Sequence, residues 1–181
     1  MLTLIMNIVL IIIPVLLAGL TFILMLKMFG DTWLAYPLDV GMNYKNRRIF
    51  GKNKTIRGPL VMMFFTGLYG FLLSLTFGIQ PNVGLFTNYV LVGLAYSVGE
   101  LPNSFIKRQF GISPGALSSD LTEARIFRLI DNFDSVIACG IAYTILFNYS
   151  LLVILVSILI GGFLHFSTDI LMIRLGIKKK D

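Results

Sequence analysis

The stretch from Leu2 to Leu26, LTLIMNIVLIIIPVLLAGLTFILML, contains no charged residue. At about 1.5 Å of rise per helical residue, a run of this length can cross a bilayer with some tilt. A cleaved signal peptide is a poor alternative, because no basic residue precedes the run and no clear small-residue cleavage site follows it. The sequence therefore predicts a transmembrane helix here, which Pro14 is expected to kink.

The rest of the 181-residue chain is similarly apolar, with 56% hydrophobic and only 13% charged residues. That charged fraction is about half of the fraction usual in soluble domains. One cysteine and one histidine can form neither an internal disulfide nor a His/Cys zinc site. Further uncharged runs predict four more spans, near residues 59–77, 83–98, 131–147 and 151–170. We therefore expect an all-α, polytopic membrane protein, a single domain over residues 1–181 with five transmembrane helices.

The charges are unevenly distributed between the connecting segments. The short links at 78–82 and 148–150 carry none, whereas the lysines and arginines gather in segments 27–58 and 99–130 and in the C-terminal tail, Lys178 to Lys180. The positive-inside tendency makes these the cytoplasmic loops. With an odd number of spans, the N-terminus is predicted outside and the C-terminus in the cytoplasm. The net charge of +6 then reflects orientation in the cell membrane, and no nucleic-acid partner is expected.

The first cytoplasmic loop is strongly basic. From Asn43 to Gly58 it is NYKNRRIFGKNKTIRG, with six cations in thirteen residues. The accompanying Gly, Asn and Thr residues let backbone and side-chain donors approach a phosphate. Alternatively, the cations set the topology and contact anionic lipid headgroups. The loop by itself leaves both interpretations open.

A second polar group follows the third apolar run and comprises Glu100, Ser104, Lys107 and Arg108. In a helix after Pro102, Ser104 would share a face with Lys107 and Arg108. A carboxylate at membrane depth is costly and usually points at water, a partner or an ion. A simple ion pair of Glu100 with one of the two cations is the alternative.

A third group precedes the fourth apolar run, where Asp131 and Asp134 are three residues apart. On a helix both carboxylates project from one face, and their repulsion calls for a nearby cation. Magnesium fits, because it prefers oxygen ligands and commonly uses one or two carboxylates plus substrate phosphates. The alternative is that both residues cap the fourth helix.

The motifs of several enzyme classes are missing from the sequence, namely the P-loop, the dinucleotide-binding glycine motif, H-E-x-x-H and G-x-S-x-G. His165 and Asp169 form an i, i+4 pair near the end of the fifth run, for which a structural hydrogen bond is the favoured interpretation. Cations and carboxylates on one membrane face are instead the parts that phosphoryl or nucleotidyl transfer uses.

Five stretches carry a resemblance to a known family: Pro37-Leu38-Asp39, Arg47 to Gly51, Lys54 to Gly58, Gly99-Glu100-Leu101 with Ser104, Lys107 and Arg108, and Asp131 to Asp134. In this order they resemble the CDP-archaeol synthase family, a branch of the cytidylyltransferases that includes CDP-diacylglycerol synthase. Glu100 departs from the Asp usual in the family. A P-x-H-G-G stretch typical of the diacylglycerol enzymes is missing, which favours the archaeol branch.

The resemblance implies transfer of a cytidylyl group from CTP to a membrane glycerolipid phosphate, either archaeol-type or phosphatidate-like, giving CDP-lipid and pyrophosphate in phospholipid biosynthesis. We expect Mg²⁺ as cofactor, held by Glu100, Asp131 and Asp134. The expected catalytic residues are Lys107, Arg108, Asp131 and Asp134. The residues expected to bind the phosphates of CTP and lipid are Arg48, Lys54, Thr55, Arg57, Ser104, Lys107 and Arg108.

Two functions of other classes use the same charges. A small transporter would need a polar path, but Asn7, Asn88 and His165 are too sparse within the predicted spans to line one. A non-catalytic membrane scaffold would use its basic loops only to hold anionic lipid, and would show no magnesium-dependent binding of CTP.

Overall fold

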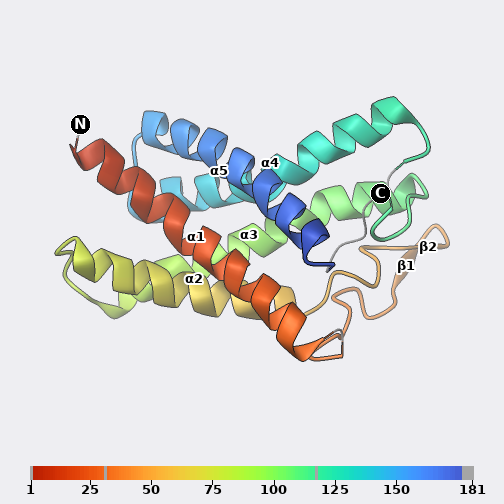
Figure 1. Ribbon diagram of the computed structural model, residues 1–181, viewed down its shortest axis with the longest axis horizontal. Helices are drawn as coiled ribbons and strands as arrows, with labels where there is room; N and C mark the ends of the chain where they lie inside the picture. Colours follow the sequence, from red (N-terminus) through yellow and green to blue (C-terminus); the bar gives the residue numbers. More distant parts are fainter. Residues whose placement is uncertain (1, 31, 117, 177–181) are drawn as a thin grey trace.

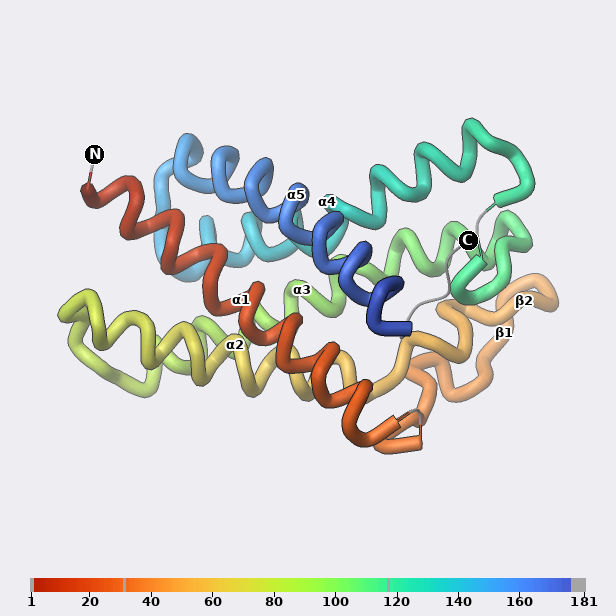
Figure 2. Tube along the Cα trace, in the orientation of Figure 1, coloured from red at the N-terminus to blue at the C-terminus, as the bar shows by residue number. Residues whose placement is uncertain are grey.

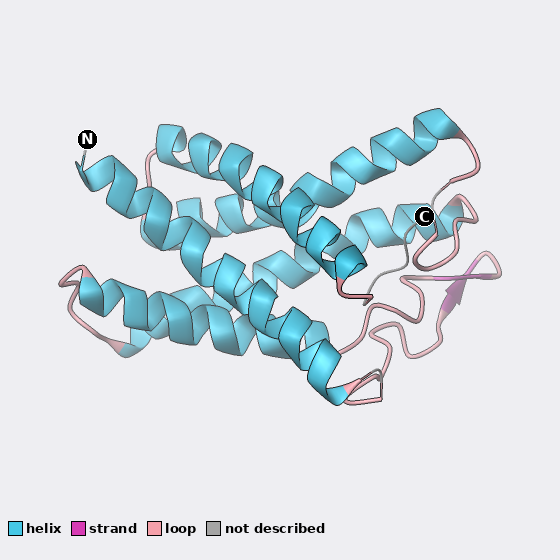
Figure 3. Ribbon diagram, viewed as in Figure 1, coloured by secondary structure: helices cyan, strands magenta, loops and turns pink. Residues whose placement is uncertain are grey.

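The computed structural model describes residues 2–30, 32–116 and 118–176, and its regular secondary structure is helical except for one small hairpin (Figures 1 and 3). The helices are α1 (Leu2–Phe29), α2 (Arg57–Thr76), α3 (Val83–Gln109), α4 (Leu121–Phe147) and α5 (Leu151–Arg174). Strands β1 (Asn43–Tyr44) and β2 (Arg47–Arg48) pair antiparallel between α1 and α2. The all-α prediction is confirmed, whereas the tail lysines Lys178 to Lys180 lie outside the described residues.

Four of the five helices, α1, α2, α4 and α5, are long and apolar enough to cross a membrane. The prediction of five spans is thus supported for four of them. Helix α3 contains the predicted run 83–98, but Asn88 and Tyr96 lower the hydropathy of that run, and the helix continues through the charged segment beyond it. These helices make the chain an integral membrane protein.

The segment 99–130, predicted as a loop, is largely helical instead. Helix α3 extends to Gln109 and α4 begins at Leu121, so only residues 110–120 connect them. Asp120 is the N-cap of α4, and its carboxylate accepts hydrogen bonds from the backbone N–H groups of Thr122 (2.7 Å) and Glu123 (2.9 Å). The helix start predicted near Asp131 is therefore wrong, and the capping alternative for the acidic pair fails with it.

The helices form a closed bundle in which each packs against the next along the chain, and α5 returns to contact α1 (Figure 2). The connections between α1 and α2 and between α3 and α4 lie at the same end of the molecule as the C-terminal end of α5 (Figure 1). The N-terminus and the two uncharged links lie at the other end. The charged segments therefore lie at one end of the bundle and the uncharged links at the other.

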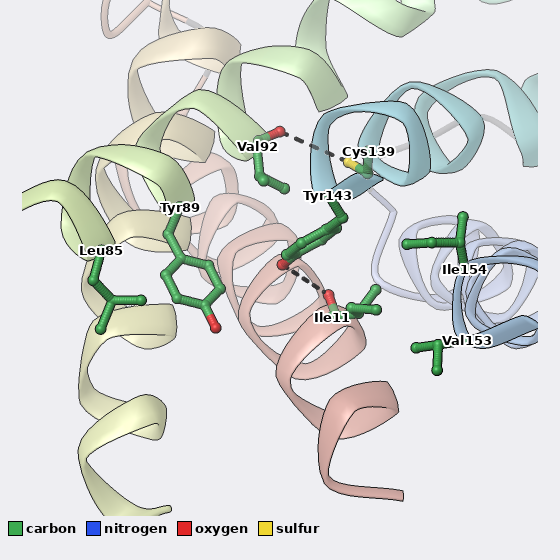
Figure 4. Packing of buried hydrophobic residues seen from close by; sticks show 8 residues of the cluster. All are labelled: Ile11, Leu85, Tyr89, Val92, Cys139, Tyr143, Val153 and Ile154. Carbon is green, nitrogen blue, oxygen red and sulfur yellow. Dashed lines mark hydrogen bonds between the residues drawn. The ribbon is translucent and has the colours of Figure 1, made fainter. Parts of the chain in front are cut away.

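The buried core shows how the bundle accommodates Pro14 within α1. A proline lacks the backbone N–H that would bond the carbonyl four residues earlier, here that of Leu10. The hydroxyl of Tyr143, on α4, approaches the oxygens of Leu10 (3.3 Å) and Ile11 (3.1 Å), as Figure 4 shows for Ile11. Tyr143 therefore supplies a hydrogen bond that the bilayer could not supply.

Candidate active site

The loop between α1 and α2 is organised around Asp39, whose side chain is completely buried. Its carboxylate accepts hydrogen bonds from the backbone N–H groups of Gly41 (3.1 Å), Phe50 (3.2 Å) and Gly51 (3.0 Å), and it forms an ion pair with Arg48. Burial acts to raise the pKa of Asp39, but these donors outweigh it and lower the pKa to about 2. The ionised carboxylate thus holds residues 48–51 against residues 39–41 of the loop.

The end of this loop is aligned by backbone hydrogen bonds, from Leu38 N–H to the Lys54 oxygen (2.8 Å) and from Ile56 N–H to the Tyr36 oxygen (3.0 Å). With the backbone fixed in this way, the Lys54 ammonium forms an ion pair with Glu100 of α3. Glu100 is therefore ion-paired, but with a lysine of the loop and not with Lys107 or Arg108 of its own helix, which the alternative interpretation named.

The two aspartates of α4 are joined to α3 by an amide and a cation. The side-chain amide of Asn103 donates to Asp131 Oδ1 (2.5 Å) and to Asp134 Oδ2 (3.1 Å). The ammonium of Lys107 lies 2.5 Å from Asp131 Oδ1. The cation that the spacing of the two carboxylates called for is present beside Asp131 as a lysine of the second polar group.

The charges of Asp131 and Asp134 also act on Lys54, which is ion-paired with Glu100. Burial acts to lower the pKa of Lys54, but the Glu100 carboxylate, with smaller contributions from Asp134 and Asp131, raises it above the ordinary value. Lys54 is therefore a permanent cation at neutral pH, placed among three carboxylates.

One face of α3 supplies most of these groups, because residues 100, 103, 104, 107 and 108 follow the i, i+3, i+4 spacing of a helix face. Asn103 was not among the predicted site residues, although it has this spacing and is only 4% exposed. Arg108 is also buried, and one of its terminal nitrogens donates to the Ile112 oxygen (2.5 Å).

Gly99 sets the distance between α3 and α4 at the site. A Cβ at this position would lie 2.6 Å from the Ala138 Cβ and 2.9 Å from the backbone oxygen of Asp134. Such distances are closer than side chains tolerate. The absence of a side chain at Gly99 therefore lets the acidic part of α4 lie directly against α3.

Charged and polar residues of the loop, α3 and α4 line one end of a cavity of about 630 Å³. We call this end of the cavity the charged end. The predicted site residues that line it are Lys54, Glu100, Ser104, Lys107, Arg108, Asp131 and Asp134. The cavity continues between α1 and α5 as an apolar arm. Ile11, Val15 and Leu16 line the arm from α1, and Ile154 and Ile158 line it from α5.

Three predicted phosphate-binding residues do not line this cavity. Arg48 is paired with Asp39, Thr55 is buried in the loop, and Arg57 donates to the backbone oxygens of Gly30 (3.4 Å) and Trp33 (3.4 Å). The contacts of Arg48 and Arg57 order the loop that carries Lys54. Their binding of phosphate stays a prediction.

The described residues contain no group of three or more His, Cys, Asp or Glu side chains arranged to hold a metal ion. Glu100 is paired with Lys54, whereas the two aspartates share Asn103. Two carboxylates beside a cavity are nevertheless the donor set that Mg²⁺ uses when substrate phosphates complete its coordination. The residues present therefore fit that ion with Asp131 and Asp134 as its protein ligands.

Comparison with known proteins finds CDP-archaeol synthases among its relatives. The CarS-like CDP-archaeol synthase family model matches residues 1–180. The CDP-archaeol synthase of Methanosarcina mazei is 31% identical over 170 residues, covering 80% of this chain and 89% of that protein. That of Methanospirillum hungatei is 26% identical over 157 residues, covering 79% and 87%.

The CDP-archaeol synthase of Pyrococcus furiosus is 37% identical over 81 residues, which cover 44% of this chain and about half (48%) of that protein. No solved structure matches the chain. Because the family model matches almost every residue and two relatives match over most of their length, the chain belongs to the CDP-archaeol synthase family.

Proposed function

We propose that this protein transfers the cytidylyl group of CTP to the phosphate of a membrane glycerolipid, archaeol-type or phosphatidate-like, and releases pyrophosphate. Membership of the family makes the chain a nucleotidyltransferase that forms a CDP-lipid from CTP. The observation that carries the finer proposal is that one cavity joins a charged end to an apolar arm. A substrate with a phosphate headgroup and apolar tails matches both parts.

In the proposed reaction an oxygen of the lipid phosphate attacks the α-phosphorus of CTP. The bond between that phosphorus and the bridging oxygen to the β-phosphate breaks, and pyrophosphate leaves with the electron pair. The lipid phosphate is ionised near neutral pH, so no protein nucleophile or strong base is required. Lys54, Lys107 and Arg108 line the charged end, where they would stabilise the charge of the transferring group.

We propose Mg²⁺ as the cofactor, with Asp131 and Asp134 as its ligands and Glu100 as the third predicted ligand. When bound, the ion would neutralise charge on the phosphates of CTP. Asn103 and Lys107 hold the carboxylates of the pair from the side of α3, and these contacts keep the two aspartates together on the cavity wall. In this proposal the ion pair with Lys54 holds Glu100 at the charged end.

We place the charged end at the cytoplasmic face of the cell membrane, where CTP is available. The support is the basic character of residues 27–58 and 99–130, which the positive-inside tendency puts in the cytoplasm. A scaffold or a transporter is not favoured, because neither activity follows from the family to which the chain belongs.

The test is an assay of the purified protein with CTP, Mg²⁺ and either an ether-linked or an ester-linked glycerolipid phosphate. Both pyrophosphate and CDP-lipid are measured. The variant Asp131→Asn should lose product formation with both lipids. The matched control Glu123→Gln, which also replaces an acid by its amide on α4 but lies outside the cavity lining, should retain it. Absence of product from the unaltered protein with either lipid would overturn the proposal.

A further inference from the structure

The apolar arm contains a histidine that the proposed reaction does not use. His165 lines the cavity from α5, and its ring lies beside that of Tyr96 on α3, with the ring centroids 6.1 Å apart. Its Nδ1 atom is buried and has no hydrogen-bond partner among the described residues. The bond to Asp169 that the sequence spacing suggested is therefore not made through this atom.

A polar atom buried in this way costs free energy unless a ligand or a water molecule bonds it. Some polar side chains of the bundle avoid that cost by bonding their own helix, as the hydroxyl of Thr144 does with the Gly140 oxygen (2.9 Å), whereas the buried hydroxyls of Thr66 and Ser157 do not. An imidazole ring cannot fold back on its helix so easily. His165 therefore offers an unused hydrogen-bonding group to whatever occupies the cavity.

The position of His165 along the cavity follows from its contact with Tyr96. Tyr96 precedes Glu100 by four residues on α3, which is one helical turn or about 6 Å along the axis. His165 thus lies about one turn from the charged end, on the side of the apolar arm. In a glycerolipid phosphate, the oxygens that link the tails to glycerol lie only a few bonds from the phosphorus, also on the tail side.

We propose that His165 is a specificity residue that binds a glycerol linkage oxygen of the lipid substrate. A ring N–H donates to the ether or ester oxygen while the lipid phosphate occupies the charged end. This contact fixes how deeply the lipid enters the cavity, and it distinguishes a glycerolipid phosphate from a phosphate on a plain alkyl chain. The inference rests on the proposed function, since it assigns a position to the lipid substrate of that reaction.

A purely structural role makes a different prediction. If the ring serves only to pack against Tyr96, His165→Phe keeps the aromatic contact and changes nothing. If the ring N–H binds the lipid, His165→Phe removes the donor, whereas His165→Asn retains an N–H near the place of Nδ1. Ser167→Ala is the control, because it removes a polar group from the same helix outside the cavity lining.

The experiment measures binding of two probes to the full-length protein in lipid nanodiscs without CTP. One probe is a dialkyl glycerol phosphate, and the other is a long-chain alkyl phosphate without glycerol oxygens. His165→Phe should weaken binding of the first probe about tenfold, the loss of one hydrogen bond, and leave the second unchanged. His165→Asn should recover most of the loss, and Ser167→Ala should match the unaltered protein. In turnover, His165→Phe should raise the KM for lipid without changing the KM for CTP.

Equal effects of His165→Phe on both probes, or no effect on either, would overturn the inference. Should that variant not fold, the unaltered protein still decides, because the inference requires it to prefer the glycerol phosphate over the alkyl phosphate. The two proposals fail separately. Selective binding without CDP-lipid formation would overturn the reaction alone, and normal turnover with no preference between probes would overturn the role of His165 alone.

Discussion

The charge of Asp39 stabilises the loop between α1 and α2 and is not used to bind a ligand. Its pKa of about 2, against an ordinary value of 3.8, means that the ionised carboxylate contributes stability above pH 4 that is lost as the pH falls toward 2. The shift corresponds to roughly 2 kcal/mol. We predict that Asp39→Asn lowers the free energy of unfolding by about that amount at neutral pH.

The measurement is denaturant unfolding of both proteins between pH 2 and pH 7. The difference between them should shrink as the pH falls from about 4 to about 2, because a protonated Asp39 resembles asparagine. A difference that stayed constant across this range would show that the charge of Asp39 is not what holds the loop.

Asn103 positions the acidic pair, and its effect should appear in the response to magnesium. Replacing a residue that orients metal ligands typically costs about 10- to 100-fold in metal affinity. We predict that Asn103→Leu raises the Mg²⁺ concentration for half-maximal activity by at least about tenfold. Asn88→Leu is the matched control on the same helix, since Asn88 bonds the Leu146 oxygen (3.2 Å) far from the pair. If Asn103→Leu needed the same Mg²⁺ concentration for half-maximal activity as the unaltered protein, Asn103 would not position the acidic pair.

From the sequence it was easier to predict which charged residues belong to the site than to predict which residues they pair with. Glu100, Lys107 and Asp131 were found from charge and spacing, and all three line the cavity. Asn103 has the same helical spacing, but it was passed over because an amide carries no charge. Arg48 was expected to bind phosphate, and its pairing with a buried Asp39 depends on a loop conformation that no local pattern predicts.

At the scale of the helices, the contact of α3 with α4 depends on Gly99. A side chain there must push the helices apart, because its Cβ would lie within 3 Å of both Ala138 and the Asp134 backbone. Displacements of about 1 Å at an active site can cost about a hundredfold in rate. We predict that Gly99→Ala reduces turnover by about that factor while the protein remains folded.

The double variant Gly99→Ala with Ala138→Gly provides the test of this reason. Removing the Ala138 methyl relieves the nearest clash, so the double variant should recover part of the lost turnover. If Gly99→Ala were as active as the unaltered protein, the close approach of the two helices would not matter for catalysis.

The helix boundaries illustrate where sequence reasoning succeeded and where it failed. The apolar runs placed all five helices, because hydrophobic length is sufficient to recognise a helix in a bilayer. The start of α4 was missed by ten residues, since Arg125, Arg128 and Glu123 suggested a loop. Asp120 followed by Glu123 is a capping pattern that marks the true start, and it was visible in the sequence.

For the whole molecule, the sequence predicted that distant charges gather but could not predict the cavity. The arm between α1 and α5 exists because these helices meet only after the bundle closes, and its shape depends on packing across the entire chain. The continuity of this arm with the charged end is what connects a soluble nucleotide to a membrane lipid in the proposed reaction.

The last prediction concerns the orientation of the bundle in the membrane. CTP can reach the charged end only if the β1–β2 hairpin faces the cytoplasm and the link between α2 and α3 faces outside. We predict that a cysteine introduced at the exposed Lys45 of the hairpin reacts with a membrane-impermeant maleimide only after cells are permeabilised. A cysteine at the exposed Val83, at the start of α3, should react in intact cells.

The native Cys139 is buried, so the unaltered protein should not be labelled and serves as the control. The reverse pattern, with Lys45→Cys labelled in intact cells and Val83→Cys protected, would separate the charged end from cytoplasmic CTP. Labelling at both positions in intact cells would indicate two orientations. In that case the basic segments do not set a single topology, and only the molecules with the hairpin inside could carry out the proposed reaction.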